Sequence, residues 1–137
     1  MAVLSLLLAM MASPGLAHEY YTNNFTLVHP WSEATDPEVQ EASVYCVLDN
    51  VQHSDRLLRA YSSLANSVEF RQSRQGLDER VDIIEVPAAD SYAMSRTSSY
   101  LVLKELRAPL QWGRSYPMTM QFEKAGFVNV MVSIGAH

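Results

Sequence analysis

The sequence predicts an all-β protein, an antiparallel Greek-key β-sandwich or barrel of about seven to nine strands. Three observations lead to this prediction. From Phe25 onward, short apolar runs follow one another, separated by turn residues. Several runs alternate apolar and polar residues and are rich in β-branched and aromatic types. No segment keeps the apolar period that an amphipathic helix would show.

The first half of the domain contains four of these runs. FTLVHPW, residues 25–31, is apolar and β-branched, and Pro30 near its end cannot donate to a strand ladder. The polar residues 32–42 are interpreted as a loop. SVYCVLDNV, residues 43–51, alternates apolar and polar side chains most regularly. The next two predicted strands are RLLRAYSS and NSVEFRQS, residues 56–63 and 66–73.

The second half continues the pattern after a turn at RQG. Residues 88–99 are mostly polar, with Tyr92 and Met94 as the expected core anchors. A closing hairpin is predicted around the turn of residues 124–126. No repeat or linker interrupts the chain, so residues 18–137 are expected to form one domain. The predicted strands are residues 80–87, 100–106, 116–123 and 127–134.

Residues 1–17 have the composition of an export signal. Val3–Ala12 is apolar, uncharged and too short to span a bilayer. Gly15 and Ala17 are the small residues expected at positions −3 and −1 of a cleavage site, although no Lys or Arg precedes the apolar run. Cleavage after Ala17 would start the mature protein at His18. This predicts a protein in a periplasm or outside a cell.

The composition restricts the classes of function. The 137 residues carry a net charge of −5, and charges of both signs are interspersed. Without a basic patch, nucleic acid is not an expected partner. Cys46 is the only cysteine, which excludes an intramolecular disulfide and CxxC redox chemistry. No Ser-His-Asp set or phosphate-binding loop indicates an enzyme.

Five short motifs occur in order along the domain. They are HPWSEAT at 29–35, VYCVLDN with DRL at 44–57, VEF at 68–70, VPA at 86–88 and FEKAG at 122–126. With them, residues 25–133 resemble the periplasmic copper chaperones of the PCuAC type. The resemblance implies a cupredoxin-like β-sandwich and copper as cargo, which that family delivers as Cu(I) to the CuA site of cytochrome oxidase.

The copper ligands of that family are missing from this sequence. The resemblance places the first H-x-M pair of the family on Arg71 and Ser73, and the last pair on Tyr100 and Val102. The intermediate methionine is missing too. A guanidinium cannot ligate a cation, because it stays protonated and has no acceptor. We therefore expect the usual copper site to be absent.

Histidines offer a different metal site. An N-terminal His18 would present its amine and ring nitrogen to one metal ion, and a second imidazole would complete a histidine brace suited to Cu(II). The second imidazole is either His29, at the end of the first strand, or His53, in a turn. His29 can share a metal with His18 only if residues 19–24 fold back. A solvated or structural role is the alternative for each histidine.

The other soft side chains are expected in the core. Cys46 lies in the middle of a predicted strand, where a buried and inert thiol is expected. Met118 and Met120 share a face of a predicted strand. Methionines at such positions more often fill gaps in a core than form a Cu(I) pair.

Together these features predict a periplasmic copper-binding accessory protein that stores or hands over copper, as Cu(II), at His18, His29 and His53. The expected partners are the copper ion and a copper-receiving membrane oxidase or oxygenase, or another copper chaperone. The alternatives are a metal-free interaction module with the same fold and a brace-type redox enzyme. The sequence leaves the oligomeric state open.

Overall fold

The computed structural model describes residues 19–135, which form eleven strands and no helix. The described residues therefore contain no helix that could cross a membrane. This confirms the predicted all-β class. The strands are β1 (Glu19–Tyr21), β2 (Thr26–Ser32), β3 (Glu41–Val51), β4 (Asp55–Tyr61), β5 (Ala65–Arg74), β6 (Leu77–Val81), β7 (Ile84–Val86), β8 (Ala89–Met94), β9 (Ser99–Leu106), β10 (Ser115–Phe122) and β11 (Gly126–Ile134).

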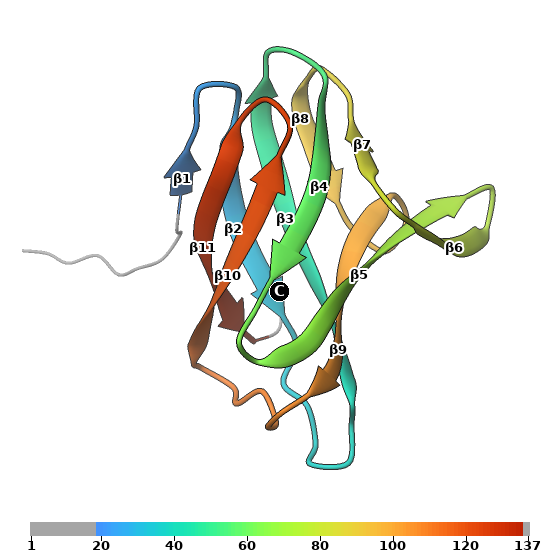
Figure 1. The fold of residues 1–137 in the computed structure, drawn as a ribbon, viewed down its shortest axis with the longest axis vertical. Helices are drawn as coiled ribbons and strands as arrows, with labels where there is room; N and C mark the ends of the chain where they lie inside the picture. The colour runs from blue at the N-terminus through green and yellow to red at the C-terminus, as the bar shows by residue number, and fades with distance from the viewer. Residues whose placement is uncertain (1–18, 136–137) are drawn as a thin grey trace, which may run out of the picture.

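The strands follow one hydrogen-bonded path in the order β6-β5-β9-β3-β2-β11-β10-β4-β7, while β1 pairs with β2 and β8 with β3. Neighbours are antiparallel except β11 and β2, where Ser133 lies opposite Trp31 in a parallel pair. In Figure 1, β10 and β4 pass in front of β2 and β3, so the path folds over itself into two layers. The core lies between these layers, as a sandwich requires.

The central strand β3 shows why the sequence folds in this way. Its side chains alternate from Glu41 to Asp49, and Val44, Cys46 and Leu48 point into the core with at most 3% exposure. The first part of β3 pairs with β9 and the second part with β8. β3 therefore connects β9 and β8, which pair with its first and second parts. Burial of Cys46 confirms the interpretation of its thiol as a core group.

The strand boundaries differ from the prediction in three places. Residues 80–87 are not one strand, because a bend at residues 82–83 separates β6 from β7. The polar residues 88–99 contain β8, whose ladder with β3 holds Met94 in the core and Tyr92 half-buried. A short β1 precedes the first predicted strand. For β7 and β8, pairing with the distant strands β4 and β3 outweighs a weak local pattern.

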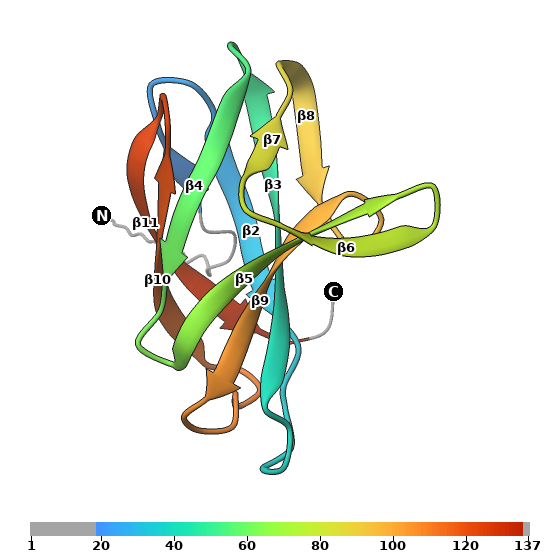
Figure 2. The same cartoon turned by 45° about the vertical axis from the view of Figure 1, so that its right-hand side comes forward.

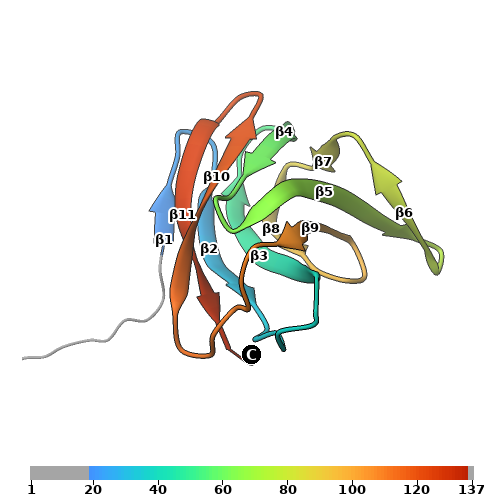
Figure 3. The ribbon, with the colours of Figure 1, turned by 60° about the horizontal axis from the view of Figure 1, so that its bottom comes forward.

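The β5–β6 hairpin projects from the body of the molecule (Figures 2 and 3). Its turn places Gln75 and Gly76 at positive φ, a conformation that glycine adopts at little cost. Charged residues, namely Asp78, Glu79 and Arg80, occupy the middle of the outer strand β6. Such charges discourage pairing of an exposed edge with another chain.

A buried carboxylate connects three turns. Asp55 is 2% exposed, and its Oδ1 accepts hydrogen bonds from the backbone N–H groups of Arg56 and Lys124, each at 2.8 Å. Its Oδ2 accepts from the Ala125 N–H and from Asn24 Nδ2, each at 3.0 Å. The DRL and FEKAG motifs therefore meet in space, together with the turn that precedes β2.

Candidate metal centre

The β1–β2 hairpin brings the start of the described chain back alongside His29. Glu19 lies opposite Val28, and Tyr21 lies opposite Thr26. Residues 19–24 therefore fold back, as the brace hypothesis required. Thr22 closes the turn, because its backbone N–H donates to the Phe25 carbonyl at 3.0 Å.

The hairpin is also attached to the opposite layer. The backbone N–H of Met131 on β11 donates to Tyr20 Oη at 2.9 Å. This bond attaches β1 to β11 in addition to its ladder with β2. The position of β1 is thus determined by a contact outside the hairpin.

His29 lies at an irregularity of β2. The register with β3 shifts between Val28 and Trp31, and His29 has a φ of 54°. Pro30, which has no N–H to offer the ladder, is buried next to it. The bulge turns the His29 side chain out of the sheet, where it is exposed. Bulges often re-aim a side chain in this way.

His29 borders a cavity of about 330 Å³ on the outer face of β2, β3 and β8. Trp31 and Tyr45 line it with ring centroids 5.2 Å apart, and Arg96 Nη2 donates to Tyr45 Oη at 2.9 Å. The remaining lining residues are Glu33, Cys46, Val47, Ala93, Met94 and Ser95. The motif HPWSE thus supplies one wall of a cavity that sequence reasoning did not predict.

A thiol and a thioether meet below this cavity. Cys46 Sγ lies 3.7 Å from Met94 Sδ, and both residues are at most 3% exposed. Burial raises the pKa of the Cys46 thiol to about 12. The sulfur therefore stays protonated near neutral pH and donates to the thioether, instead of serving as a thiolate.

The positions that the resemblance assigns to copper ligands carry a charge network. Arg71 on β5 lies opposite Tyr100 on β9. The guanidinium donates to Glu69 Oε2 and Asp78 Oδ1, each at 2.9 Å, and Tyr100 Oη donates to Asp78. Lys104 Nζ lies 4.0 Å from Glu69 Oε1. At the position of a family copper ligand, the protein therefore carries the Arg71 guanidinium, held by two carboxylates.

The network shifts three pKa values. Hydrogen bonds to Glu69 and then to Asp78 raise the pKa of Arg71 further above its ordinary range. The hydrogen bond from Tyr100, followed by that from Arg71, lowers the pKa of Asp78 against an opposing effect of desolvation. Burial, followed by the bond to Asp78, raises the pKa of Tyr100. All three groups therefore keep their ordinary charge near neutral pH.

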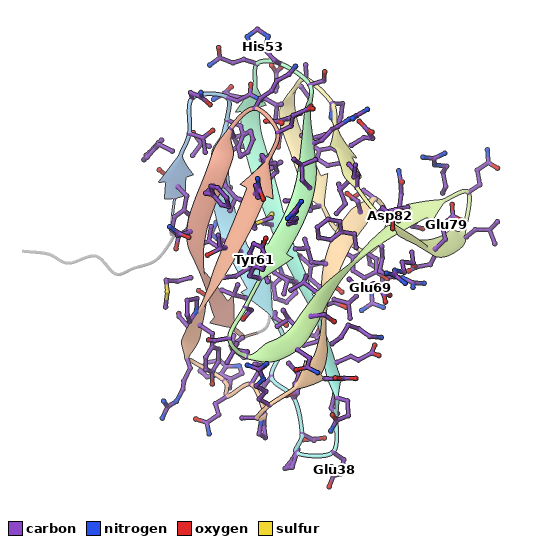
Figure 4. The ribbon with its side chains drawn as sticks, in the orientation of Figure 1. Glu38, His53, Tyr61, Glu69, Glu79 and Asp82 are labelled. Carbon is purple, nitrogen blue, oxygen red and sulfur yellow. The ribbon has the colours of Figure 1, made fainter. Side chains whose placement is uncertain are left out.

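The structure describes two of the three predicted imidazoles, His29 and His53. His18 lies outside the described residues. His53 is exposed at the tip of the β3–β4 loop (Figure 4), where its backbone bonds Asn24 at 2.9 Å in both directions. It does not line the cavity beside His29. Within residues 19–135, no three His, Cys, Asp or Glu side chains are grouped as metal ligands.

The methionine pair of β10 belongs to the core. Met118 and Met120 are each 2% exposed and pack in the main apolar cluster. This confirms the interpretation of both side chains as core filling. The missed features depend on strand register: the cavity joins segments that are distant in sequence, and Asp78 reaches Arg71 across the β5–β6 hairpin.

Comparison with known proteins identifies the family. The model of the LpqE-like family, whose description names a lipoprotein, matches residues 25–134. This chain belongs to the LpqE-like family. No protein of curated function matches it.

Solved structures similar to this LpqE-like chain include PCuAC domains. The copper-bound PCuAC domain from PmoF2 is 28% identical, with a TM-score of 0.75 over 88% of this chain and 99% of that one. The apo PCuAC domain from PmoF1 is 25% identical, with a TM-score of 0.74 over 88% and 100%. Cu(I)-DR1885 from Deinococcus radiodurans, 19% identical with a TM-score of 0.66 over 77% and 74%, shows the fold alone. The resemblance to the PCuAC type is confirmed.

Proposed function

We propose that this LpqE-like protein is an exported copper-binding accessory protein that stores copper or hands it over, and that it is not an enzyme. The copper-bound PmoF2 domain, similar over 88% of this chain, supports copper as the cargo. At the positions of the family ligands, however, Arg71 already supplies a cation held by Glu69 and Asp78. The proposed site therefore lies elsewhere.

The β1–β2 register is the observation that supports a site at His18 and His29. Glu19 lies opposite Val28, and the proposal requires one further step of this register to bring residue 18 opposite His29. Directly opposed residues have Cβ atoms about 5 Å apart, close enough for two imidazoles to share one ion. The amine and ring of His18 with the ring of His29 would give the nitrogen-rich, tetragonal set that Cu(II) prefers.

His53 is the other predicted partner of His18. Because its backbone is bonded to Asn24 at the tip of the β3–β4 loop, it would have to approach from outside the cavity that His29 lines. We therefore propose His29 as the partner and retain His53→Ala as the matched control.

The test compares four proteins by Cu(II) titration and EPR. These are the protein beginning at His18, the same protein with one extra N-terminal glycine, and the variants His29→Ala and His53→Ala. We expect a nitrogen-rich type 2 signal in the first and in His53→Ala, and its loss in the other two. Equal, weak binding in all four would contradict the N-terminal site.

Export is the second part of the proposal. The family description names a lipoprotein, which supports a protein exported from the cytoplasm. We propose cleavage after Ala17 and a periplasmic location. The intact mass of protein purified from the periplasm of a host expressing the whole chain would begin at His18. A mass that retains residues 1–17 would exclude the required free amine.

A metal-free interaction module is the second candidate function. The observation that favours it is the charge network of Arg71, Glu69 and Asp78, which replaces a ligand set by side chains that pair with each other. Such a protein would bind a copper-receiving oxidase or oxygenase, or another copper chaperone, without metal. Capture of one of these partners by protein that binds no copper would support this function over the first.

A further inference from the structure

The cavity beside His29 lies on the outer face of the sheet formed by β2, β3 and β8. On this face, β3 presents Ser43, Tyr45, Val47 and Asp49, all half-buried. An outer strand position next to water normally carries a polar side chain. Tyr45 and Val47 instead line the cavity together with Trp31 of β2. Apolar residues gather here around a concave space.

The size and walls of the cavity limit what it can hold. A volume of about 330 Å³ is at the lower end of the range of small-molecule sites, which starts near about 300 Å³. Trp31 and Tyr45 form a tilted pair at an interplanar angle of 48°. Aromatic walls favour an aromatic ring as the guest, through edge and offset contacts. The cavity therefore fits one ring with a short substituent.

Two opposite charges border this space. The Glu33 carboxylate and the Arg96 guanidinium both line the cavity, and among residues 19–135 they form no ion pair with each other. Arg96 uses one donor on Tyr45 Oη, and Asp78 is a further charge near it. A guanidinium has five N–H donors, so others remain for a carboxylate. Glu33 can accept from an ammonium group.

We propose that this cavity binds a free aromatic α-amino acid as its zwitterion. The ring lies against Trp31 and Tyr45, the α-carboxylate accepts hydrogen bonds from Arg96, and the α-ammonium donates to Glu33. Ligands with one charge satisfy one of these two groups and leave the other in water. This binding site requires no metal and does not depend on the proposed copper function.

The test uses three probes that share one ring and differ in charge. These are L-phenylalanine, phenethylamine and 3-phenylpropionate, titrated in EDTA so that copper plays no part. Trp31 and Trp112 are the only tryptophans, so Trp112→Phe leaves Trp31 as the single fluorescent reporter. Amide chemical shifts of Val47 and Ala93 provide an independent measure of occupancy. We expect phenylalanine to bind most tightly of the three.

Two charge-neutralising variants distinguish the roles of the two side chains. Arg96→Gln should weaken the binding of phenylalanine and phenylpropionate roughly tenfold and leave the binding of phenethylamine unchanged. Glu33→Gln should weaken the binding of phenylalanine and phenethylamine by a similar factor and leave the binding of phenylpropionate unchanged. Glu38→Gln, on the exposed loop outside the cavity, is the matched control and should change none of them.

Three results would overturn the proposal. The first is equal binding of all three probes. The second is a loss of affinity that is the same for all three probes in Arg96→Gln and in Glu33→Gln. The third is the absence of any change at Trp31, Val47 and Ala93 at millimolar probe concentration. None of these results bears on the Cu(II) titration, so failure here and failure of the copper site remain distinguishable.

Discussion

At the scale of single residues, Arg71 determines what this PCuAC fold can hold at the position of the family's ligands. Its guanidinium satisfies Glu69 and Asp78 on one sheet face, and Tyr100 donates to the same Asp78. A metal ion there would meet a cation that cannot ligate and stays protonated. Restoring imidazoles and thioethers at the four positions should therefore change the metal preference of the protein.

The first prediction is a gain of Cu(I) binding. The combined variant Arg71→His, Ser73→Met, Tyr100→His and Val102→Met should bind Cu(I), because soft thioethers and imidazoles suit that ion. Competition with a Cu(I)-specific chelator measures the affinity. Arg71→Gln alone is the control and should gain none. A folded variant that still leaves all Cu(I) with the chelator would show that these positions do not converge.

The second prediction concerns acid stability. The pKa of Asp78 is lowered in the folded state, first by Tyr100, so its ionised form stabilises the fold. This contribution is complete above the ordinary carboxyl pKa near about 4 and is lost as pH falls through the lower folded value. The difference in unfolding free energy between the parent and Asp78→Asn should therefore shrink below about pH 4. Urea unfolding at several pH values measures it, and a difference independent of pH would contradict the assignment.

The sequence predicted part of this residue-scale picture. The identities at positions 71, 73, 100 and 102 were sufficient to predict that the usual ligands are absent, because ligand chemistry is a property of each side chain. The partner of Arg71 could not be predicted. Asp78 reaches it through the β5–β6 register, which depends on where the hairpin turns. The opposition of Arg71 and Tyr100 likewise depends on pairing between distant strands.

At the scale of elements, the β1–β2 hairpin connects the chain entry to the proposed copper site. Sequence reasoning left open whether residues 19–24 fold back, because Thr-Asn-Asn permits a bend without requiring one. The structure answers this through long-range contacts, since Met131 donates to Tyr20 Oη and the next turn is held by Asp55. Both contacts can be removed separately.

The third prediction removes the contact between β1 and β11. Tyr20→Phe deletes the acceptor for the Met131 N–H and should loosen the hairpin by about 1 kcal/mol. If the hairpin presents the Cu(II) site, its affinity should fall roughly fivefold in a competition titration. Tyr21→Phe is the matched control, because among residues 19–135 the Tyr21 hydroxyl bonds only Glu19, and the residue is 75% exposed. If both variants change the Cu(II) affinity equally, the contact between β1 and β11 does not position the metal site.

The fourth prediction concerns the carboxylate that joins three turns. Asp55→Ala leaves the Lys124 and Ala125 N–H groups and the Asn24 amide without their acceptor in a buried place. It should lower the free energy of unfolding by about 3 kcal/mol. The control Asp49→Ala removes one surface hydrogen bond from Ser91 and should cost less than about 1 kcal/mol. Urea denaturation of both variants provides the comparison, and similar losses would refute the central role of Asp55.

At the scale of the whole molecule, the stability of the fold depends on a sandwich core without disulfides. The alternating apolar pattern was enough to predict this architecture, because one buried face per strand requires two packed layers. The extra strands were not predictable, since β1 and β8 are short, bury few side chains and exist through their partners β2 and β3. Pairing with core strands therefore makes β1 and β8 extended, although their local sequences do not predict strands.

The fifth prediction uses Cys46 to report on this core. Burial raises the pKa of its thiol to about 12, so the reactive thiolate is scarce in the folded protein at pH 8. Since Cys46 is 3% exposed, labelling by a thiol reagent should require opening of the sandwich. The free energy from labelling rates in urea should equal that from global unfolding. Ser91→Cys, exposed on β8, should react at once as the control. Rapid labelling of Cys46 without denaturant would instead reveal local opening between β3 and β8, beside the cavity that His29 lines.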